Sequence, residues 1–225
     1  MSDPYAVIVL AKTPVPGRVK TRLCPPATPD QAADLAAAAL LDTLAATAAF
    51  PPARTVVALA GRITDGARAT EVTTATAGAH VIAQRGVGLG TRIAAAHADT
   101  SVLLPGLASL QVGMDTPQID ATLLADCADR LAHADAVLGP AADGGWWLLG
   151  LRDPRAAALI AEVPTSRPDT GAATLRALQG GGLRVATAPQ LRDVDTIADA
   201  VAVARLAPRT AFAAAVQQLA AVPAR

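Results

Sequence analysis

The chain has 225 residues, of which 52% are hydrophobic, 17% charged and 2% aromatic, with a formal net charge of zero. A chain of this length can bury roughly 70–75% of its unfolded surface, which is enough for one good-sized domain, and no linker divides it. The balanced charge and the scarcity of aromatic residues argue against a partner among the nucleic acids.

Cysteine usage and apolar runs indicate the compartment. Cys24 and Cys127 are the chain's two cysteines, too few for a disulfide framework, so we expect a cytoplasmic protein. The first residues lack the charged and apolar regions of a signal peptide. No apolar run reaches the length of about 18 residues that a membrane span needs, so we expect none.

The first predicted element is a buried strand over residues 6–11, a continuous apolar run typical of a central strand. Residues 12–26 follow at its carboxyl end and carry four cations and four prolines. Both lysines of the chain lie here, and Lys is a compact charge suited to phosphate oxygens. The alternative is a solvated basic loop, which the prolines and Gly17 disfavour. The cations proposed to bind a di- or triphosphate are Lys12, Arg18, Lys20 and Arg22.

A long Ala/Leu-rich helix is predicted over residues 29–50, with Thr28 or Asp30 as its cap. Strands are predicted at 55–60 and 80–83, with a weak helix and turn between them.

Glycines 86, 88 and 90 then precede another helix, with Arg92 in its first turn. Glycines at such a place allow a ligand to approach the backbone N–H groups of a helix N-terminus. The G-x-G-x-G spacing does not match a dinucleotide fingerprint, and no P-loop motif occurs.

A short buried strand at 110–113 leads through Gly113 into Asp115. Open α/β sheets bind ligands at the carboxyl ends of their strands, and Mg²⁺ and Mn²⁺ prefer carboxylate oxygens. Asp115 is therefore a candidate metal ligand. The alternative is an Asx-turn, in which the carboxylate bonds its own backbone.

A helix at 121–132 and a strand at 136–139 precede the turn Asp143-Gly144-Gly145 and a strand at 146–151. Successive side chains of a strand alternate faces, so one of Trp146 and Trp147 should point to the core and the other to the opposite face. The turn is either part of a substrate pocket or an ordinary hairpin.

Residues 153–162 are predicted to be helical, and the polar loop 164–171, which includes Thr170, is interpreted as a lid. A helix to about residue 179 and a strand at 183–187 follow. Asp193 and Asp195 stand two apart, so at β spacing both side chains point the same way, as one metal site requires. The alternative is a helix cap by Asp195 or Thr196. Helices at 197–206 and 209–220 close the chain, and the three isolated histidines show no zinc-ligand spacing.

Four stretches resemble, in order and spacing, those of bacterial glycosyltransferase-A-like proteins of the nucleotide-diphospho-sugar transferase superfamily. They are AKTPVPGRVKTRL at 11–23, GMDTP at 113–117, GPAADGGWW at 139–147 and DVDT at 193–196. The opening loop and the late aspartates also resemble 2-phospholactate guanylyltransferase. The resemblance implies a single three-layer α/β/α domain with a mostly parallel, mixed sheet. It implies a nucleotide-binding half at about 1–117 and an acceptor half at about 118–225.

The same resemblance implies roles for individual residues. A Mg²⁺ or Mn²⁺ ion would be held by Asp115, Asp193 and Asp195, and the catalytic residues would be Lys20, Asp115 and Asp143. The nucleotide would contact Ala11, Lys12, Gly17, Arg18, Lys20, Arg22, Gly88, Leu89, Gly90 and Arg92. A small-molecule acceptor would contact Asp143, Gly144, Gly145, Trp146, Trp147 and Thr170. A homodimer is compatible with this reading.

Three functions follow as hypotheses. The first is a metal-dependent transferase of the nucleotide-sugar glycosyltransferase type, and the second is a nucleotidyltransferase that releases pyrophosphate. The third is a catalytically silent nucleotide-binding protein, because the lid carries Val163-Pro164-Thr165 where many relatives have a Trp before the Thr. Asp115 also stands in D-x-P rather than in the D-x-D of many glycosyltransferases.

Overall fold

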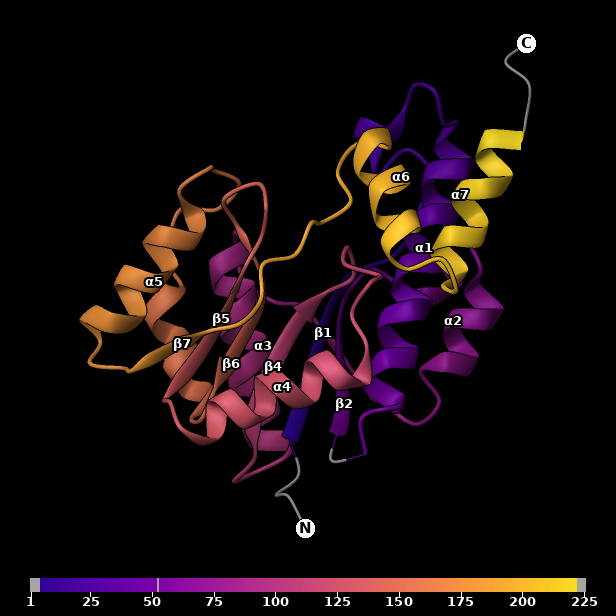
Figure 1. The fold of residues 1–225 in the computed structure, drawn as a ribbon. Helices are drawn as coiled ribbons and strands as arrows, with labels where there is room; N and C mark the ends of the chain where they lie inside the picture. Colours follow the sequence, from indigo (N-terminus) through magenta and orange to yellow (C-terminus); the bar gives the residue numbers. More distant parts are fainter. Residues whose placement is uncertain (1–4, 52, 222–225) are drawn as a thin grey trace.

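The computed structural model describes residues 5–51 and 53–221. The first four residues, on which the expected absence of a signal peptide partly rests, lie outside this range. Seven strands form one sheet in the order β3-β2-β1-β4-β6-β5-β7 (Figure 1). Their bounds are Tyr5–Lys12 (β1), Ala53–Ala60 (β2), His80–Ala83 (β3), Ala108–Gly113 (β4), Ala136–Pro140 (β5), Trp146–Leu151 (β6) and Val185–Thr187 (β7).

Strand β6 is antiparallel to both of its neighbours, β4 and β5, whereas the other pairings in the sheet are parallel. The sheet is therefore mostly parallel and mixed, as the family resemblance implies. This arrangement of strands determines which loops meet at the candidate site. The amino end of β6 lies at the same edge of the sheet as the carboxyl ends of β1, β2 and β4, so the turn before β6 meets the loops that follow the parallel strands.

Seven α-helices and three short 3₁₀ helices connect the strands in the described part of the chain. The α-helices are Pro29–Ala48 (α1), Ala69–Ala75 (α2), Leu89–Leu103 (α3), Ala121–Ala132 (α4), Thr170–Gly180 (α5), Ile197–Leu206 (α6) and Ala211–Ala221 (α7). The 3₁₀ helices are Thr21–Leu23 (η1), Ile63–Asp65 (η2) and Pro154–Ile160 (η3). None of the helices among the described residues is both long enough and apolar enough to span a membrane.

The predicted caps are found at both helices for which alternatives were open. Thr28 begins α1 with a capping box, in which its hydroxyl accepts from Gln31 N and the Gln31 side chain accepts from Thr28 N. Thr196 caps α6 in the same way through Asp199. The capping role therefore falls to Thr196 rather than to Asp195. Helix α7 begins at 211 rather than 209, because the Thr210 hydroxyl accepts from Ala213 N and ends the preceding turn.

The helices cover both faces of the sheet (Figure 1). Helices α1 and α4 pack on one face, where they share a buried cluster with residues of β1, β2, β4 and β6. Helix α3, η3 and α5 pack on the opposite face. Helices α6 and α7 lie against the outer side of α1 through a second apolar cluster. This three-layer arrangement leaves the loops at the carboxyl ends of the parallel strands free to form a site.

Candidate active site at the carboxyl edge of the sheet

Three aspartates from two distant segments converge at this edge. Asp143 comes from the turn before β6, and Asp193 and Asp195 come from the extended segment between β7 and α6. One carboxylate oxygen of each lies within 4.8 Å of those of the other two. An all-oxygen donor set of this kind suits a hard divalent cation such as Mg²⁺ or Mn²⁺.

The electrostatics of this acidic group agree with a cation site. Burial and then the negative charges of Asp143 and Asp195 together raise the pKa of Asp193 to about 6, against the opposing effect of Lys20. Carboxylates so close together repel each other, and a bound cation relieves that repulsion. The residues present therefore fit a divalent metal ion.

Asp115 lies beside this group but is held differently. Lys20 Nζ is 2.9 Å from Asp115 Oδ1 and 3.7 Å from Asp195 Oδ1, and it also donates to the Val194 carbonyl. The Asp115 carbonyl in turn accepts from Val194 N at 3.0 Å. The Lys20 ammonium thus joins Asp115 to the segment that carries the late aspartates. The sequence predicts Asp115 with Asp193 and Asp195 as ligands, whereas the tightest group contains Asp143 in its place.

The cationic loop after β1 lies against the same aspartates. Arg22 pairs with Asp195 at 2.9 Å, and Lys12 Nζ donates to the Arg18 carbonyl at 2.9 Å. Lys20 adopts a left-handed φ of 48° at the start of η1, and its side chain is 10% exposed. All four cations line a cavity of about 270 Å³, together with Asp115 and Asp195. Gly17, with φ of 73°, supplies the turn of this loop.

A larger cavity of about 440 Å³ adjoins the first and shares Lys12, Met114 and Asp115 with it. Its walls come from both halves of the chain. Among the predicted residues it is lined by Ala11, Lys12, Leu89, Arg92, Asp115, Asp143, Gly145, Trp146, Trp147, Thr170 and Asp193.

The residues of the glycine-rich turn before α3 have different structural roles. Leu89 and Arg92 line the larger cavity, and Gly88 caps α3 with φ of 87°. Gly90 is buried, and a Cβ there would lie 2.5 Å from the Ala161 carbonyl oxygen. Gly90 is therefore needed for close packing of α3 against the end of η3.

The Asp-Gly-Gly turn carries the predicted lid. Asp143 Oδ1 accepts from Gly145 N at 2.8 Å, an Asx-type bond. The turn also joins the antiparallel strands β5 and β6, so it is the hairpin that the sequence left as an alternative and lines the cavity as well. Gly144 has φ of 89°, and a Cβ there would lie 1.9 Å from the Pro168 carbonyl oxygen. The Gly144 carbonyl also accepts from Gly171 N at 2.8 Å. The loop 164–171 thus packs directly on the turn that presents Asp143.

The tryptophans divide as predicted. Trp147 is buried in the main core, and its Nε1 donates to the Pro189 carbonyl at 2.9 Å. Trp146 packs against the cluster on the α3 face, and its Nε1 donates to Thr174 Oγ1 at 3.1 Å. Thr170 begins α5, and its hydroxyl donates to the Pro164 carbonyl. Thr170 therefore closes the lid loop on itself at the cavity wall.

Two glutamines line the larger cavity that the sequence analysis did not identify as site residues. Gln84 follows β3, and its Nε2 donates to the carbonyls of Ala11 and Ala58. Gln111 is buried in β4 and lines the same cavity. An amide between Leu110 and Val112 in a buried strand was the signal in the sequence that could have identified Gln111.

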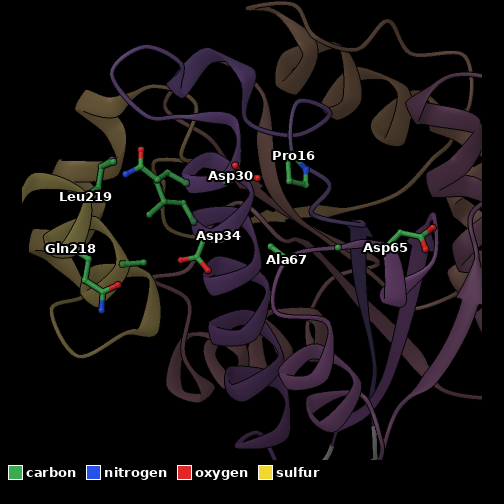
Figure 2. Close-up of a pocket in the computed structure, with 11 residues that line it drawn as sticks. Pro16, Asp30, Asp34, Asp65, Ala67, Gln218 and Leu219 are labelled. Carbon is green, nitrogen blue, oxygen red and sulfur yellow. The ribbon is translucent and has the colours of Figure 1, made fainter. Parts of the chain in front are cut away.

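A third cavity, of about 630 Å³, lies away from these residues, between α1, α7 and the region of η2 (Figure 2). Asp30, Asp34 and Asp65 line it, but Asp34 is neutralised by Arg68 at 2.6 Å. None of the predicted site residues lines this cavity, so its volume does not make it the candidate site.

Comparison with known proteins gives a family match and several similar solved structures. A model of the family described as "Uncharacterized protein conserved in bacteria (DUF2064)" matches residues 43–167. The comparison with curated proteins finds no match.

Among solved structures, the chain is similar to a proposed nucleotide-diphospho-sugar transferase from Desulfovibrio desulfuricans G20. The two are 27% identical with a TM-score of 0.83, over 98% of this chain and 96% of that chain. A CMP:2-keto-3-deoxy-manno-octonic acid synthetase complexed with CTP is 16% identical, with a TM-score of 0.53 over 91% and 99% of the two chains. Rv0371c of Mycobacterium tuberculosis H37Rv, complexed with manganese, is 19% identical, with a TM-score of 0.50 over 90% and 98%. The last two likenesses show a shared fold.

Proposed function

The chain belongs to the bacterial family described as DUF2064, and from the site at the edge of its sheet we propose that it is a metal-dependent transferase acting on a nucleotide substrate. One observation carries the proposal. Three carboxylates that fit a divalent cation lie against a loop of four cations, and both groups open on adjoining cavities. The similar structures include a proposed nucleotide-diphospho-sugar transferase, a protein complexed with CTP and a protein complexed with manganese.

We assign the cation to Asp143, Asp193 and Asp195, with Asp115 as a further carboxylate at the border of the group. A Mg²⁺ or Mn²⁺ ion there would neutralise charge on the phosphates of the nucleotide. Lys12, Arg18, Lys20 and Arg22 would bind the phosphate oxygens from the opposite side. Because Lys20 and Arg22 are held by carboxylates before the substrate arrives, these two cations would stabilise developing phosphate charge with little reorganisation.

The proposed division of the chain follows from the walls of the larger cavity. The first half, about 1–117, would bind the nucleotide through Ala11, Lys12 and the turn at 88–92. The second half, about 118–225, would bind the acceptor through Asp143, the tryptophans and Thr170. The loop 164–171, docked on the turn 143–145, would cover the acceptor.

Within this class, we propose transfer of a glycosyl group from a nucleotide sugar as the first candidate. The D. desulfuricans protein supports it, being similar over nearly the whole of both chains. Nucleotidyl transfer is the second candidate, because four cations around one cavity suit a triphosphate. The two reactions differ in the bond that breaks, and therefore in the product released.

The test is incubation of the purified protein with Mn²⁺ or Mg²⁺ and a panel of nucleoside triphosphates and nucleotide sugars. Release of a nucleoside diphosphate from a nucleotide sugar supports glycosyl transfer, whereas release of pyrophosphate from a triphosphate supports nucleotidyl transfer. Binding without turnover under either metal would indicate a silent nucleotide-binding protein. Failure to bind any nucleotide would contradict the proposal.

A further inference from the structure

Gln111 is a buried amide that the protein itself leaves without a complete set of partners. It lies in β4, is 2% exposed, and its Oε1 accepts no hydrogen bond from any of the described residues. Buried side-chain polar atoms in folded proteins almost always have a partner, so each exception needs an explanation. The neighbours of Gln111 in the strand are Leu110 and Val112, and an apolar residue would serve the core equally well.

The position of Gln111 offers that explanation, because the side chain lines the larger cavity. Part of the lining of this cavity is apolar and includes Leu10, Leu89 and Ile93. The aspartates that fit a cation come from other loops. A ligand group that extends from the phosphate loop into this part of the cavity would meet apolar side chains and one unpartnered amide.

Gln84 completes this part of the wall. Its amide nitrogen is engaged by the carbonyls of Ala11 and Ala58, at 2.8 and 2.9 Å, which ties the ends of β1 and β2 together and fixes the side chain. Gln111 Oε1 and the Thr116 hydroxyl are then the buried polar groups of this cavity lining that have no partner among the described residues, and of the two only the amide oxygen is solely an acceptor. A nucleobase matches this part of the cavity, because its flat faces are apolar and its edge carries N–H donors.

We propose that Gln111 reads the N–H edge of the nucleobase and so determines which nucleotide this protein accepts. The inference rests on the proposed function, and it adds a specificity-determining residue to it. A site built to hydrogen-bond a particular group rejects an analogue that lacks the group, because its own buried polar atom then stays unpaired.

The experiment compares the wild-type protein with Gln111→Met, which has a similar length and no amide. Dissociation constants are measured with Mn²⁺ for ATP, GTP, ITP, CTP and UTP, and for inorganic tripolyphosphate as a probe of the phosphate loop alone. We expect the wild-type protein to prefer one base at least about tenfold, and Gln111→Met to reduce that preference to within about threefold. Tripolyphosphate should bind both proteins equally. Gln217→Met, on the exposed side of α7, is the matched control and should behave as wild type.

A merely structural role for Gln111 predicts a different result. Removal of an unsatisfied buried amide should leave the melting temperature unchanged or higher, so lower stability without a change in base preference would overturn the inference. Unchanged preference in a stable variant would also overturn it, as would a wild-type protein that does not discriminate between bases. If the wild-type protein binds no nucleotide at all, the proposed function fails as well.

Discussion

Asp193 is the residue on which the proposed chemistry depends most. It is half-buried, and its pKa is raised to about 6 by burial and then by Asp143 and Asp195. Asp115, by contrast, has a dedicated cation in Lys20 at 2.9 Å. The two aspartates therefore differ in how much a bound metal ion would change their surroundings.

We predict that Asp193→Asn abolishes the rise in melting temperature that Mn²⁺ produces, because it removes a carboxylate from the centre of the acidic group. Asp115→Asn should weaken the response and not remove it. Thermal unfolding at increasing Mn²⁺ concentrations measures both effects. Asp129→Asn, on the exposed side of α4, is the matched control. An unaltered response in Asp193→Asn would remove this residue from the cation site.

At the scale of elements, the turn before β6 and the loop 164–171 form one unit. Gly144 provides both the left-handed conformation and the space in which the Pro168 carbonyl lies, and its own carbonyl accepts from Gly171 N. Trp146 extends the contact by donating to Thr174 in α5. The position of Asp143 is thus tied to the position of the lid.

Gly144→Ala should detach this lid. A left-handed φ costs an alanine about 1 kcal/mol, and a Cβ at 1.9 Å from the Pro168 oxygen forces the loop to move. We expect faster proteolysis within residues 164–171, which limited proteolysis of the purified variant measures. Gly180→Ala is the control, since a Cβ there meets no atom within 4 Å. Equal proteolysis of the two variants would contradict the proposed docking.

At the scale of the whole molecule, α1 joins two apolar clusters. One face of the helix packs on the sheet, and the other packs against α6 and α7 around Phe212. Asp42 strengthens this junction by accepting from the backbone N–H groups of Ala211 and Phe212 at 2.9 and 2.8 Å. The C-terminal helices therefore support the fold through α1 and not through the sheet.

Phe212→Ala should destabilise the protein by about 3–5 kcal/mol, the usual cost of removing a fully buried aromatic ring. Phe212 is 1% exposed, whereas Leu206 nearby is 71% exposed. Leu206→Ala should therefore change stability little. Denaturant unfolding of both variants gives the two free energies, and similar values would show that the second cluster contributes little.

His97 makes the stability of the whole fold depend on pH. It is a buried residue of α3 whose Nδ1 is 2.9 Å from Ser109 Oγ in β4, and burial lowers its pKa to about 3. Because the folded-state pKa is below the unfolded value of about 6.5, the stabilising contribution of the neutral ring is complete above pH 6.5. It is lost progressively as the pH falls from 6.5 towards 3.

The expected loss between pH 7 and pH 5 is about 2 kcal/mol from this one residue. His97→Gln should show a smaller loss over the same range, although it will be less stable at pH 7. Denaturant unfolding at the two pH values measures the difference. His133 is the C-cap residue of α4, and His133→Gln serves as the control. Parallel losses in wild type and His97→Gln would show that another group titrates.

Local pattern in the chain was enough to predict most elements of this fold. The apolar runs of β1, β2 and β4 and the Ala/Leu periodicity of α1 depend on nearest neighbours, so each is visible in a short window. The same holds for the loop 12–26 and for the turn 143–145, whose residue types require an irregular backbone. The alternatives left open at Thr28 and Thr196 were decided by hydrogen bonds over three residues.

Local pattern did not predict which side chains contact one another within the site. The sequence by itself determined that acidic and basic loops follow buried strands, and that a mostly parallel sheet would gather such loops at one edge. Only the tertiary structure decided that Asp143 joins Asp193 and Asp195 while Lys20 takes Asp115. The reason is the antiparallel insertion of β6, which brings the turn before that strand to the same edge. Which side chains then meet depends on register between strands far apart in the chain, and no local pattern contains it.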